Sequence, residues 1–292
     1  MRYKRPAEPN EINNIDLKLV ILGFLVAFFS AGVGIGGGTL LVSSLTLLFG
    51  FNFKRAASTS LATIIPISLV GAVSHLLFSP LMPNLEYHCC FIIPCVIGSI
   101  IGGRCFKKSQ GFHLKLAFAI FLLVISLRML KLFDFPAILF GSTQNIIVKN
   151  EFIFIPLFGF FVGTLAVLLG IGCGLLIVPF FIIIIGFKIH EAIQLSLTTM
   201  FFLTFSATIV NNKFNLLDKV AVNILFFPAL SGAFFGALLS SYLPASVLKF
   251  IFGGFLALVA IQSIADLLTA HLGKGPIIGK YYLTKITERR SK

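Results

Sequence analysis

Charged side chains are scarce in this chain. Asp, Glu, Lys and Arg together make up 11% of its 292 residues, whereas they make up about a quarter of an average soluble domain. Hydrophobic residues reach 58%, and the mean hydropathy is +1.03. Exposure of a run such as 152–187, which holds no charged residue, to water would be strongly unfavourable. The composition therefore excludes a soluble domain and predicts a protein that lies in the lipid bilayer.

Motifs of the common enzyme classes are absent as well. The sequence has no Walker lysine motif, no HExxH and no GxSxG, and no pair of acidic residues lies within an apolar run. Asp266, near the end of the last run, comes closest to an intramembrane carboxylate, so a cation site built on such a group is not predicted. We therefore expect no catalytic residue and no enzyme activity.

The cysteines form no CxxC pair and show no metal-ligand spacing with the five histidines, so we expect neither a metal nor a cofactor. They are Cys89, Cys90, Cys95, Cys105 and Cys173. Two interpretations are open: the adjacent Cys89 and Cys90 are redox-active near a membrane surface, or the cysteines are small apolar fillers. The net charge of +13 does not indicate nucleic-acid binding, because the basic residues lie between apolar runs and in a C-terminal tail.

The chain repeats itself. Residues 23–63 return without a gap 136 positions later as residues 159–199, with fifteen identical positions. Among them, Gly34, Gly36 and Gly38 recur as Gly170, Gly172 and Gly174. The correspondence resumes at an offset of 134, where Gly98 and Gly102 match Gly232 and Gly236. Duplication in an apolar chain is typical of transporters.

Eight apolar runs follow from the pattern, four in each half: 17–49, 56–78, 88–106, 112–132, 152–187, 192–210, 220–240 and 247–269. We expect an all-α membrane protein, a polytopic helical bundle of two homologous repeats. Its parts are a cytoplasmic N-terminal tail (1–16), repeat 1 (17–132), a linker (133–151), repeat 2 (152–269) and a basic cytoplasmic tail (270–292).

The first run of each half is too long for one straight span. A helix of its length would extend about 50 Å, whereas the hydrocarbon core is about 30 Å thick. Glycines in its middle favour a break. The broken element either crosses once or folds back as a hairpin. The hairpin places 18 of the 23 Lys and Arg residues on the side of the N-terminus, the single crossing places 15 there, and basic residues prefer the cytoplasmic side. The hairpin is favoured, and it would invert the second repeat, so that loops 50–55 and 186–191 lie on opposite sides.

Such breaks are the candidate site, because unpaired backbone N–H groups at membrane depth persist only when they are buried in protein or line a watery cavity. The half-helices that begin at Thr39 and Leu175 would offer an anion free N–H groups and the positive end of a helix dipole. This hypothesis requires water to reach at least one of the breaks. The alternative is that these glycines only permit close helix packing. The glycines concerned are Gly34, Gly36, Gly37, Gly38, Gly170, Gly172 and Gly174.

A polar seam in the helix after each break could complete the ligand shell. It comprises Ser60 and Thr63 in the first half and Ser196 and Thr199 in the second. Such hydroxyls also bond their own or a neighbouring helix, which is the alternative. His75 closes the first seam, either as a proton or anion contact or as an interfacial residue. The equivalent Lys115 and Lys249 either attract anions or anchor the helices in the interface.

The stretch AGVGIGGGTLLVSSLTLLFGFNFKRAASTSLATI, with its second copy GIGCGLLIVPFFIIIIGFKIHEAIQLSLTT, resembles the TauE/SafE family of sulfite or organosulfonate exporters. The resemblance covers nearly the whole chain. It implies a multi-pass permease of the bacterial inner membrane for small sulfur-containing anions. The chain departs from the family pattern at Ser58 and Gln194, and Cys173 stands where the first half has Gly37.

We therefore expect a permease that exports a small anion, most simply sulfite, a sulfonate or another sulfur oxyanion. Its expected partners are that anion and the lipid bilayer, and not nucleic acid, while a homodimer is compatible with the sequence. Two other classes remain open. A sulfur-relay or assembly factor would use Cys89, Cys90 or Cys173 chemically, and a passive anion channel would share the architecture.

Overall fold

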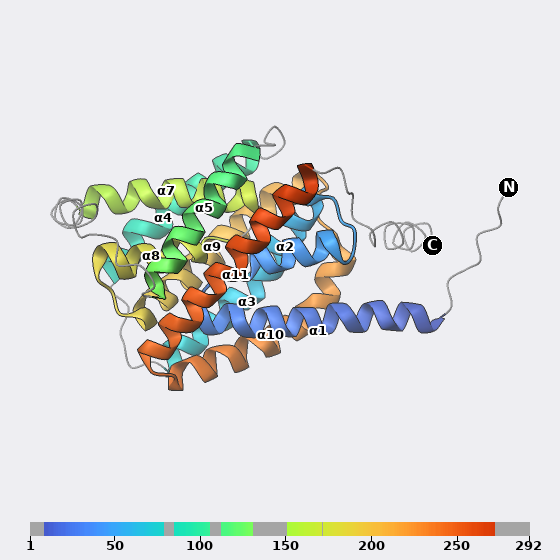
Figure 1. Ribbon diagram of the computed structural model, residues 1–292, viewed down its shortest axis with the longest axis horizontal. Coiled ribbons are helices and arrows are strands. Elements are labelled where there is room, and N and C mark those ends of the chain that lie inside the picture. Colours follow the sequence, from blue (N-terminus) through green and yellow to red (C-terminus); the bar gives the residue numbers. More distant parts are fainter. Residues whose placement is uncertain (1–8, 79–84, 106–111, 131–150, 171, 272–292) are drawn as a thin grey trace.

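The computed structural model describes residues 9–78, 85–105, 112–130, 151–170 and 172–271, and this part of the chain is helical (Figure 1). The first half contains α1 (Pro9–Val33), α2 (Gly38–Leu47), α3 (Phe53–Phe78), α4 (Leu85–Cys105) and α5 (Phe112–Met129). The second contains α7 (Glu151–Leu169), α8 (Gly174–Phe180), the π-helix η1 (Phe181–Ile185), α9 (Ile189–Lys213), α10 (Lys219–Tyr242) and α11 (Ala245–His271).

Seven of these helices are long and apolar enough to cross a membrane, which confirms the predicted class of polytopic helical membrane protein. Each of the six shorter apolar runs corresponds to one helix. The long run 17–49 corresponds to α1 and α2, and the long run 152–187 to α7, α8 and η1. The helix α1 begins at Pro9 and so extends into the segment expected as a tail. The expected linker up to residue 150 and the C-terminal tail from residue 272 lie outside the described residues.

The two long runs are divided where glycines permit a backbone that other residues adopt only with strain. Helix α1 ends at Val33 and α2 starts at Gly38, while α7 ends at Leu169 and α8 starts at Gly174. Gly34 and Gly36 have φ values of +74° and +87°, in the left-handed region that favours glycine. The helix ladder cannot continue through such residues, so each run is interrupted.

After the first interruption the chain turns back. Leu19, early in α1, shares one buried cluster with Leu45 and Phe49 at the far end of α2. The two helices therefore form a hairpin, and Figure 1 shows α2 lying beside α1. The end of α2 and the end of η1 close in the same way. The N–H of Phe51 donates to the carbonyl of Leu45 and that of Phe187 to the carbonyl of Phe181, with Gly50 and Gly186 at positive φ.

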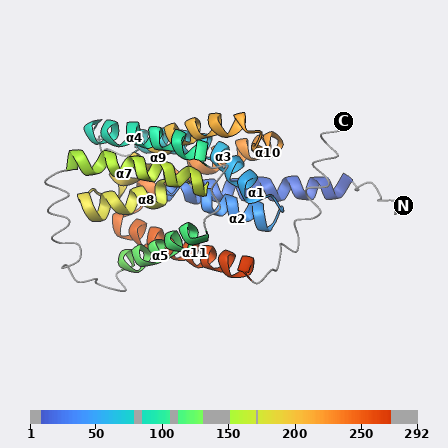
Figure 2. The same cartoon turned by 90° about the horizontal axis from the view of Figure 1, so that it is seen from above.

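The two halves of the chain pack crosswise, which means that the closest helix pairs take one helix from each half. Helix α1 lies along α10 of the other half, and α7 lies along α4 (Figure 2). Glycines make these contacts close, because a methyl group at Gly98 or Gly102 would overlap the carbonyls of Phe160 and Thr164 in α7. On the other pair, Gly232 and Gly236 meet the carbonyls of Phe24 and Phe28 in the same manner. Small residues thus permit the backbone approach that drives helix association in membranes.

The chain also turns back after the second interruption, because Phe158 of α7 stacks on Phe180 of α8, with ring centroids 3.8 Å apart. The loops that follow the two hairpins lie at opposite ends of the bundle. Phe51 packs in the cluster of Ala221 and Leu225, at the end where α3 and α10 begin. Phe187 packs against Tyr87, with ring centroids 5.2 Å apart, at the end where α4 begins. Since α4 follows α3 in the chain and starts where α3 finishes, these are different ends. Large apolar side chains such as Phe227 and Leu77 are exposed on the outer surface, as expected of a surface in contact with lipid.

Candidate functional site

The two interruptions meet in the interior. A methyl group placed on Gly36 would come within 4.0 Å of the Gly172 Cα, and one placed on Gly172 within 3.9 Å of the Gly36 Cα. Gly174 packs directly on the Gly34 carbonyl, so the backbones of the two halves touch here. Gly34 and Gly36 of the first interruption and Gly172 and Gly174 of the second, which are distant in the sequence, thus form one cluster, while Gly170 packs against Ala57 in α3.

The backbone conformation explains why one repeat has a glycine at a position where the other has a different residue. Gly37, at the N-cap of α2, has φ of +61°, whereas Cys173, at the same position before α8, has φ of −100°. A side chain is therefore tolerated at residue 173 without backbone strain. Gly36 and Gly172 both keep positive φ, at +87° and +72°, and both positions are glycine in the sequence.

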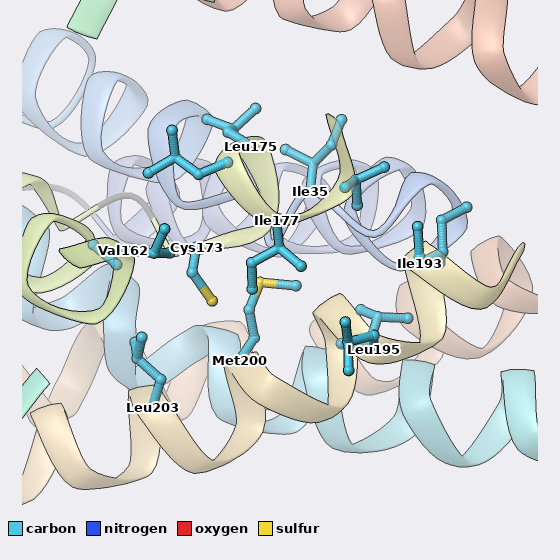
Figure 3. Close-up of a cluster of buried hydrophobic side chains, with 14 of the residues drawn as sticks. Ile35, Val162, Cys173, Leu175, Ile177, Ile193, Leu195, Met200 and Leu203 are labelled. Carbon is cyan, nitrogen blue, oxygen red and sulfur yellow. The ribbon is translucent and has the colours of Figure 1, made fainter. Parts of the chain in front are cut away.

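The interruptions are closed to water in this conformation. Every described residue of 31–39 and 170–174 is buried, and a methyl group on Gly36 would overlap the Met200 Sδ. Figure 3 shows Met200 and Cys173 in one apolar cluster with Ile35 and Ile177. The burial of these described residues at the two interruptions, here called the two tips, leaves the water access that the sequence-based hypothesis required unmet in this conformation. An open, apolar depression of about 590 Å³ lies on the outer face between α1 and α10.

The predicted hydroxyl seam is buried as well, but its protons are already donated. Ser60 Oγ donates to the Gly38 carbonyl at 3.3 Å, and Ser196 Oγ to the Gly34 carbonyl at 2.7 Å. Thr63 and Thr199 donate to carbonyls one turn back in their own helices, Thr59 and Leu195. Ser60 and Ser196 therefore support the first interruption directly, whereas the two threonines follow the alternative interpretation.

His75 is buried and bonds the end of α1. Its Nε2 lies 3.1 Å from the Ala31 carbonyl, one of the last four carbonyls of α1 and therefore without a partner within that helix. The other ring nitrogen, Nδ1, is buried with no hydrogen-bond partner. Asn211, which the repeat places at the equivalent position, is likewise buried, and neither atom of its side-chain amide has a partner. His75 does not touch Gly36 or Gly37 in any described contact, so its position is that of a helix cap.

Two hydroxyls at the first interruption have no partner. Ser30 is fully buried and Thr39 is 6% exposed, and the oxygens of both side chains are without a hydrogen bond. A methyl group on Gly37 would lie 3.3 Å from the Ser30 Oγ, so this hydroxyl adjoins the N-cap of α2. Sequence reasoning identified Thr39 but missed Ser30. The sequence did contain a signal, because residue 30 is a polar serine where the equivalent position of the second repeat is the apolar Ala166.

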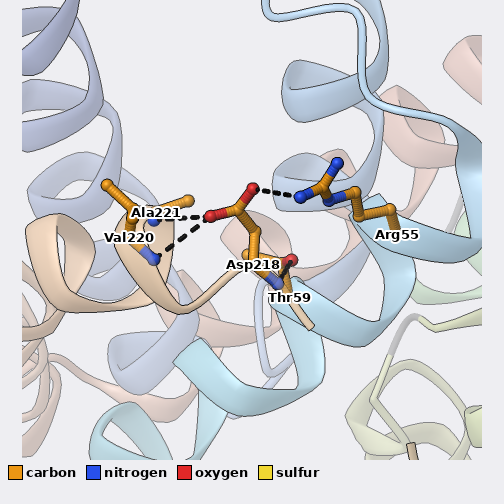
Figure 4. Close-up of polar contacts among 5 residues, drawn as sticks. All are labelled: Arg55, Thr59, Asp218, Val220 and Ala221. Carbon is orange, nitrogen blue, oxygen red and sulfur yellow. Dashed lines mark hydrogen bonds and ion pairs between the residues drawn. The ribbon is translucent and has the colours of Figure 1, made fainter. Parts of the chain in front are cut away.

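A buried ion pair was also missed. Asp218 is fully buried, and its Oδ2 lies 2.9 Å from the Arg55 Nη2 (Figure 4). The other oxygen, Oδ1, accepts from the N–H groups of Val220 and Ala221 and so caps α10. Asp266 was expected to be the carboxylate nearest the membrane interior. Asp218 is instead the buried carboxylate among the described residues, because packing of α3 against α10 encloses a residue that the sequence places between apolar runs.

The remaining candidates differ in exposure. Cys89 is exposed and Cys90 half-buried, while Cys95 and Cys173 are buried in contact with each other as free thiols. Lys249 is exposed, and the side chains of Lys115 and Cys105 lie outside the described ones. Within the described residues, no group of three His, Cys, Asp or Glu side chains is placed to hold a metal ion.

Comparison with known proteins gives one family and two relatives. Residues 1–129 and 155–286 match the family model described as "Sulfite exporter TauE/SafE". The probable membrane transporter protein YunE of Bacillus subtilis (strain 168) is 30% identical over 111 residues, which cover 38% of this chain and 40% of that protein. The sulfite exporter TauE/SafE family protein 5 of Arabidopsis thaliana is 31% identical over 110 residues, 37% of this chain and 24% of that protein. The matched segments thus span less than half of either relative. No solved structure matches the chain.

Proposed function

The chain belongs to the sulfite exporter TauE/SafE family, and we propose that it is a membrane permease for a small anion. The substrate that this membership favours is sulfite, a sulfonate or another sulfur oxyanion, and the direction is export. The protein would lie in the bacterial cytoplasmic membrane with both termini in the cytoplasm, because the hairpin arrangement places most basic residues on that side.

The observation that carries the proposal is the meeting of two interrupted helices inside the bundle. The N-terminal amides of a helix have no partner within it, and together they favour negative charge. Neither interruption has a buried Lys or Arg in a described contact, so the positive potential available there comes from backbone amides. The amides of residues 36–39 or of residues 172–175 would hold the charge. The hydroxyls of Ser60, Thr63, Ser196 and Thr199 and the ring of His75 would become further contacts only after leaving their present carbonyl partners.

Transport by this site requires that the two tips separate, because they are in contact in the present conformation. The crosswise packing supports such a movement. The hairpin of α1 and α2 is held by α10, while the hairpin of α7 and α8 is held by α4, so each tip belongs to a different helix pair. Sliding of one pair against the other would open the site to one side at a time, as in other transporters with paired repeats.

The test is the flux of radiolabelled sulfite in vesicles of both orientations. We expect saturable flux from the intact chain and a loss of at least about ten-fold in Gly36→Val and Gly172→Val. A side chain at either position would fill the space between the two interruptions and strain a backbone of positive φ. Gly254→Val is the matched control, since a side chain at this exposed position would meet nothing within 4 Å. Flux that never saturates would indicate a passive channel instead.

Because Gly36→Val can also fail to fold, accessibility provides a second measurement. In a chain whose cysteines are all replaced, Thr39→Cys should react with a small maleimide in membrane vesicles, as the site opens during its cycle. Leu256→Cys, buried in α11, should stay unlabelled. Absence of labelling at residue 39 under all conditions would mean that the interruptions never open, and the proposal would be abandoned.

Replacement of all five cysteines separates a permease from a sulfur-relay factor. Cys173 and Cys95 are buried in contact with each other and Cys89 is exposed, so thiol chemistry would need some of these groups. A permease should keep its sulfite flux in the cysteine-free chain. Flux that disappears while the protein remains folded would favour the relay.

A further inference from the structure

The two interruptions occupy equivalent places in the repeats but differ in polarity. Ser30 and Thr39 flank the first interruption, and the residues at the same positions of the second are Ala166 and Leu175. All four side chains are buried. A ligand that enters between the tips would therefore meet hydroxyl groups on one side and hydrocarbon on the other.

The hydroxyls of Ser30 and Thr39 are unusual because nothing in the described chain bonds them. Buried polar atoms in native proteins nearly always have a partner, and each exception needs a reason. Several other buried hydroxyls follow the rule by bonding a backbone carbonyl of their own helix: Ser68 donates to Ile64 at 2.8 Å, and Thr204 to Met200 at 2.7 Å. The hydroxyls of Thr208 in α9 and Ser240 in α10 are further exceptions. A hydrogen bond to a carbonyl one turn back in the same helix thus satisfies buried hydroxyls elsewhere in the chain, but the hydroxyls of residues 30 and 39 make no such bond.

Both residues lie close to the start of α2. The Ser30 Oγ adjoins Gly37, which is the N-cap of α2, and Thr39 lies in the first turn of that helix. Helix α2 has ten residues, enough for its first N–H groups to act together as a donor set. Gly37, the N-cap residue, has no side chain and therefore does not cap these amides.

Residues of the second half also complete the first interruption. Ser196 in α9 bonds the Gly34 carbonyl, and Ser60 in α3 bonds the Gly38 carbonyl. Each of these two carbonyls at the edges of the interruption therefore already accepts one hydrogen bond. The hydroxyls of Ser30 and Thr39 have no partner and remain available as donors.

The second interruption offers no such set. Its short helix α8 has seven residues. The Cys173 thiol before it contacts the Cys95 thiol, and the neighbouring side chains of Leu175 and Ala166 are apolar. Met200 and Ile64 pack against Gly172. This side of the cluster resembles an apolar wall.

We infer that the anion is held by the first interruption alone, through the amides at the N-terminus of α2 and the hydroxyls of Ser30 and Thr39, while the second interruption is the apolar wall against which the site closes. This inference rests on the proposed permease function. The chemistry selects a ligand with several acceptor oxygens on one centre, because the donors converge from a helix end and two side chains. A single-atom anion such as chloride could engage fewer of them.

The experiment compares Ser30→Ala and Thr39→Val with two matched controls. Ser68→Ala and Thr46→Val make the same chemical changes at hydroxyls that bond their own helix, and Thr46 lies on α2 itself. The KM of sulfite flux should rise about ten-fold or more in each site variant, as expected for loss of a hydrogen bond to an anion. It should stay within about two-fold in the controls.

Thermal unfolding of the purified protein in detergent gives an independent reading. Sodium sulfite should raise the unfolding temperature of the intact chain more than sodium chloride of equal ionic strength does, because a ligand that binds only the folded state stabilises it. The site variants should unfold at the unchanged temperature without sulfite and lose the shift. Folded site variants with the intact KM and shift would overturn the inference. Absence of saturable flux and of any shift in the intact chain would instead reject the permease function, and the inference with it.

Discussion

The guanidinium of Arg55 and the carboxylate of Asp218, 2.9 Å apart from Nη2 to Oδ2, join the first half of the chain to the second. The backbone N–H of Asp218 also donates to the Thr59 hydroxyl at 3.2 Å, so α3 and α10 are bonded twice at the ends where they begin. The guanidinium lies over the Phe51 ring, 5.8 Å from its centroid, which ties the end of the first hairpin to the same group.

Arg55→Ala should therefore destabilise the protein. It leaves the fully buried Asp218 without its counter-charge, a change that costs about 3–5 kcal/mol when both partners are buried. Because Arg55 is 25% exposed, water can partly replace it, and we expect roughly 1–3 kcal/mol. The measurement is the unfolding temperature in detergent. Asp218→Asn, which keeps the cap of α10, should cost less than Asp218→Ala, and equal effects of the two would show that the cap is unimportant.

The crosswise helix packing predicts that Gly236→Ala is strongly destabilising. A methyl group there would overlap the Phe28 carbonyl, and α10 would have to move away from α1. Overpacking of this kind costs about 1–3 kcal/mol. The control is Gly254→Ala in α11, where a methyl group meets nothing within 4 Å and the position is exposed. Unfolding in detergent compares the two variants, and the prediction fails if both behave alike.

The positions of the hairpin loops predict labelling from opposite sides of the membrane. Asn52 and Lys188 are equivalent in the repeats and exposed, and they lie next to Phe51 and Phe187 at the two ends of the bundle. Single cysteines at these positions, in a cysteine-free chain, should react with a membrane-impermeant thiol reagent from different sides. Intact cells and inside-out vesicles provide the comparison. Reaction of both from the same side would refute the inverted arrangement.

The contact of His75 with α1 predicts that this residue is a structural cap. Gln places a side-chain N–H where the Nε2 of histidine lies, so His75→Gln should keep both stability and sulfite flux. His75→Ala leaves the buried Ala31 carbonyl without its donor and should cost about 1–3 kcal/mol. Unfolding temperature and flux across pH values measure both effects. A folded Gln variant without flux would instead indicate that the imidazole carries protons.

Much of the helix layout could be predicted from the two long runs, 17–49 and 152–187, because the length of a helix and the place of its interruption are local properties. A run that is too long for the bilayer, with Gly34 and Gly36 in its middle, either crosses once as a broken helix or folds back as a hairpin. The first half-helix after each break was expected at Thr39 and Leu175 and begins one residue earlier in both cases. The long apolar runs also identified the membrane-spanning helices, since a continuous run of that composition has no other stable environment.

The candidate site was less predictable. Ser60 and Ser196 were chosen as ligands because they share a helix face, but the partner of each hydroxyl depends on which backbone approaches it. Ser196 bonds Gly34, 162 positions away, and no pattern within either repeat indicates that contact. The closed state of the interruptions was equally hidden, since it follows from Met200 and Gly172 reaching the same place as Gly36.

Composition was thus sufficient for the membrane class, and the glycine pattern for the places where helices break, because these follow from transfer to lipid and from backbone conformation within short segments. The duplication and the family resemblance rested on the repeated motifs of the sequence itself. Folding in three dimensions settled which helices pair, which glycine meets which carbonyl, and which polar groups are left with no partner. The physical reason is that pairing energies arise between segments far apart in the chain. Ser30 and Asp218 acquire their significance only when α2 and α3 are packed beside them.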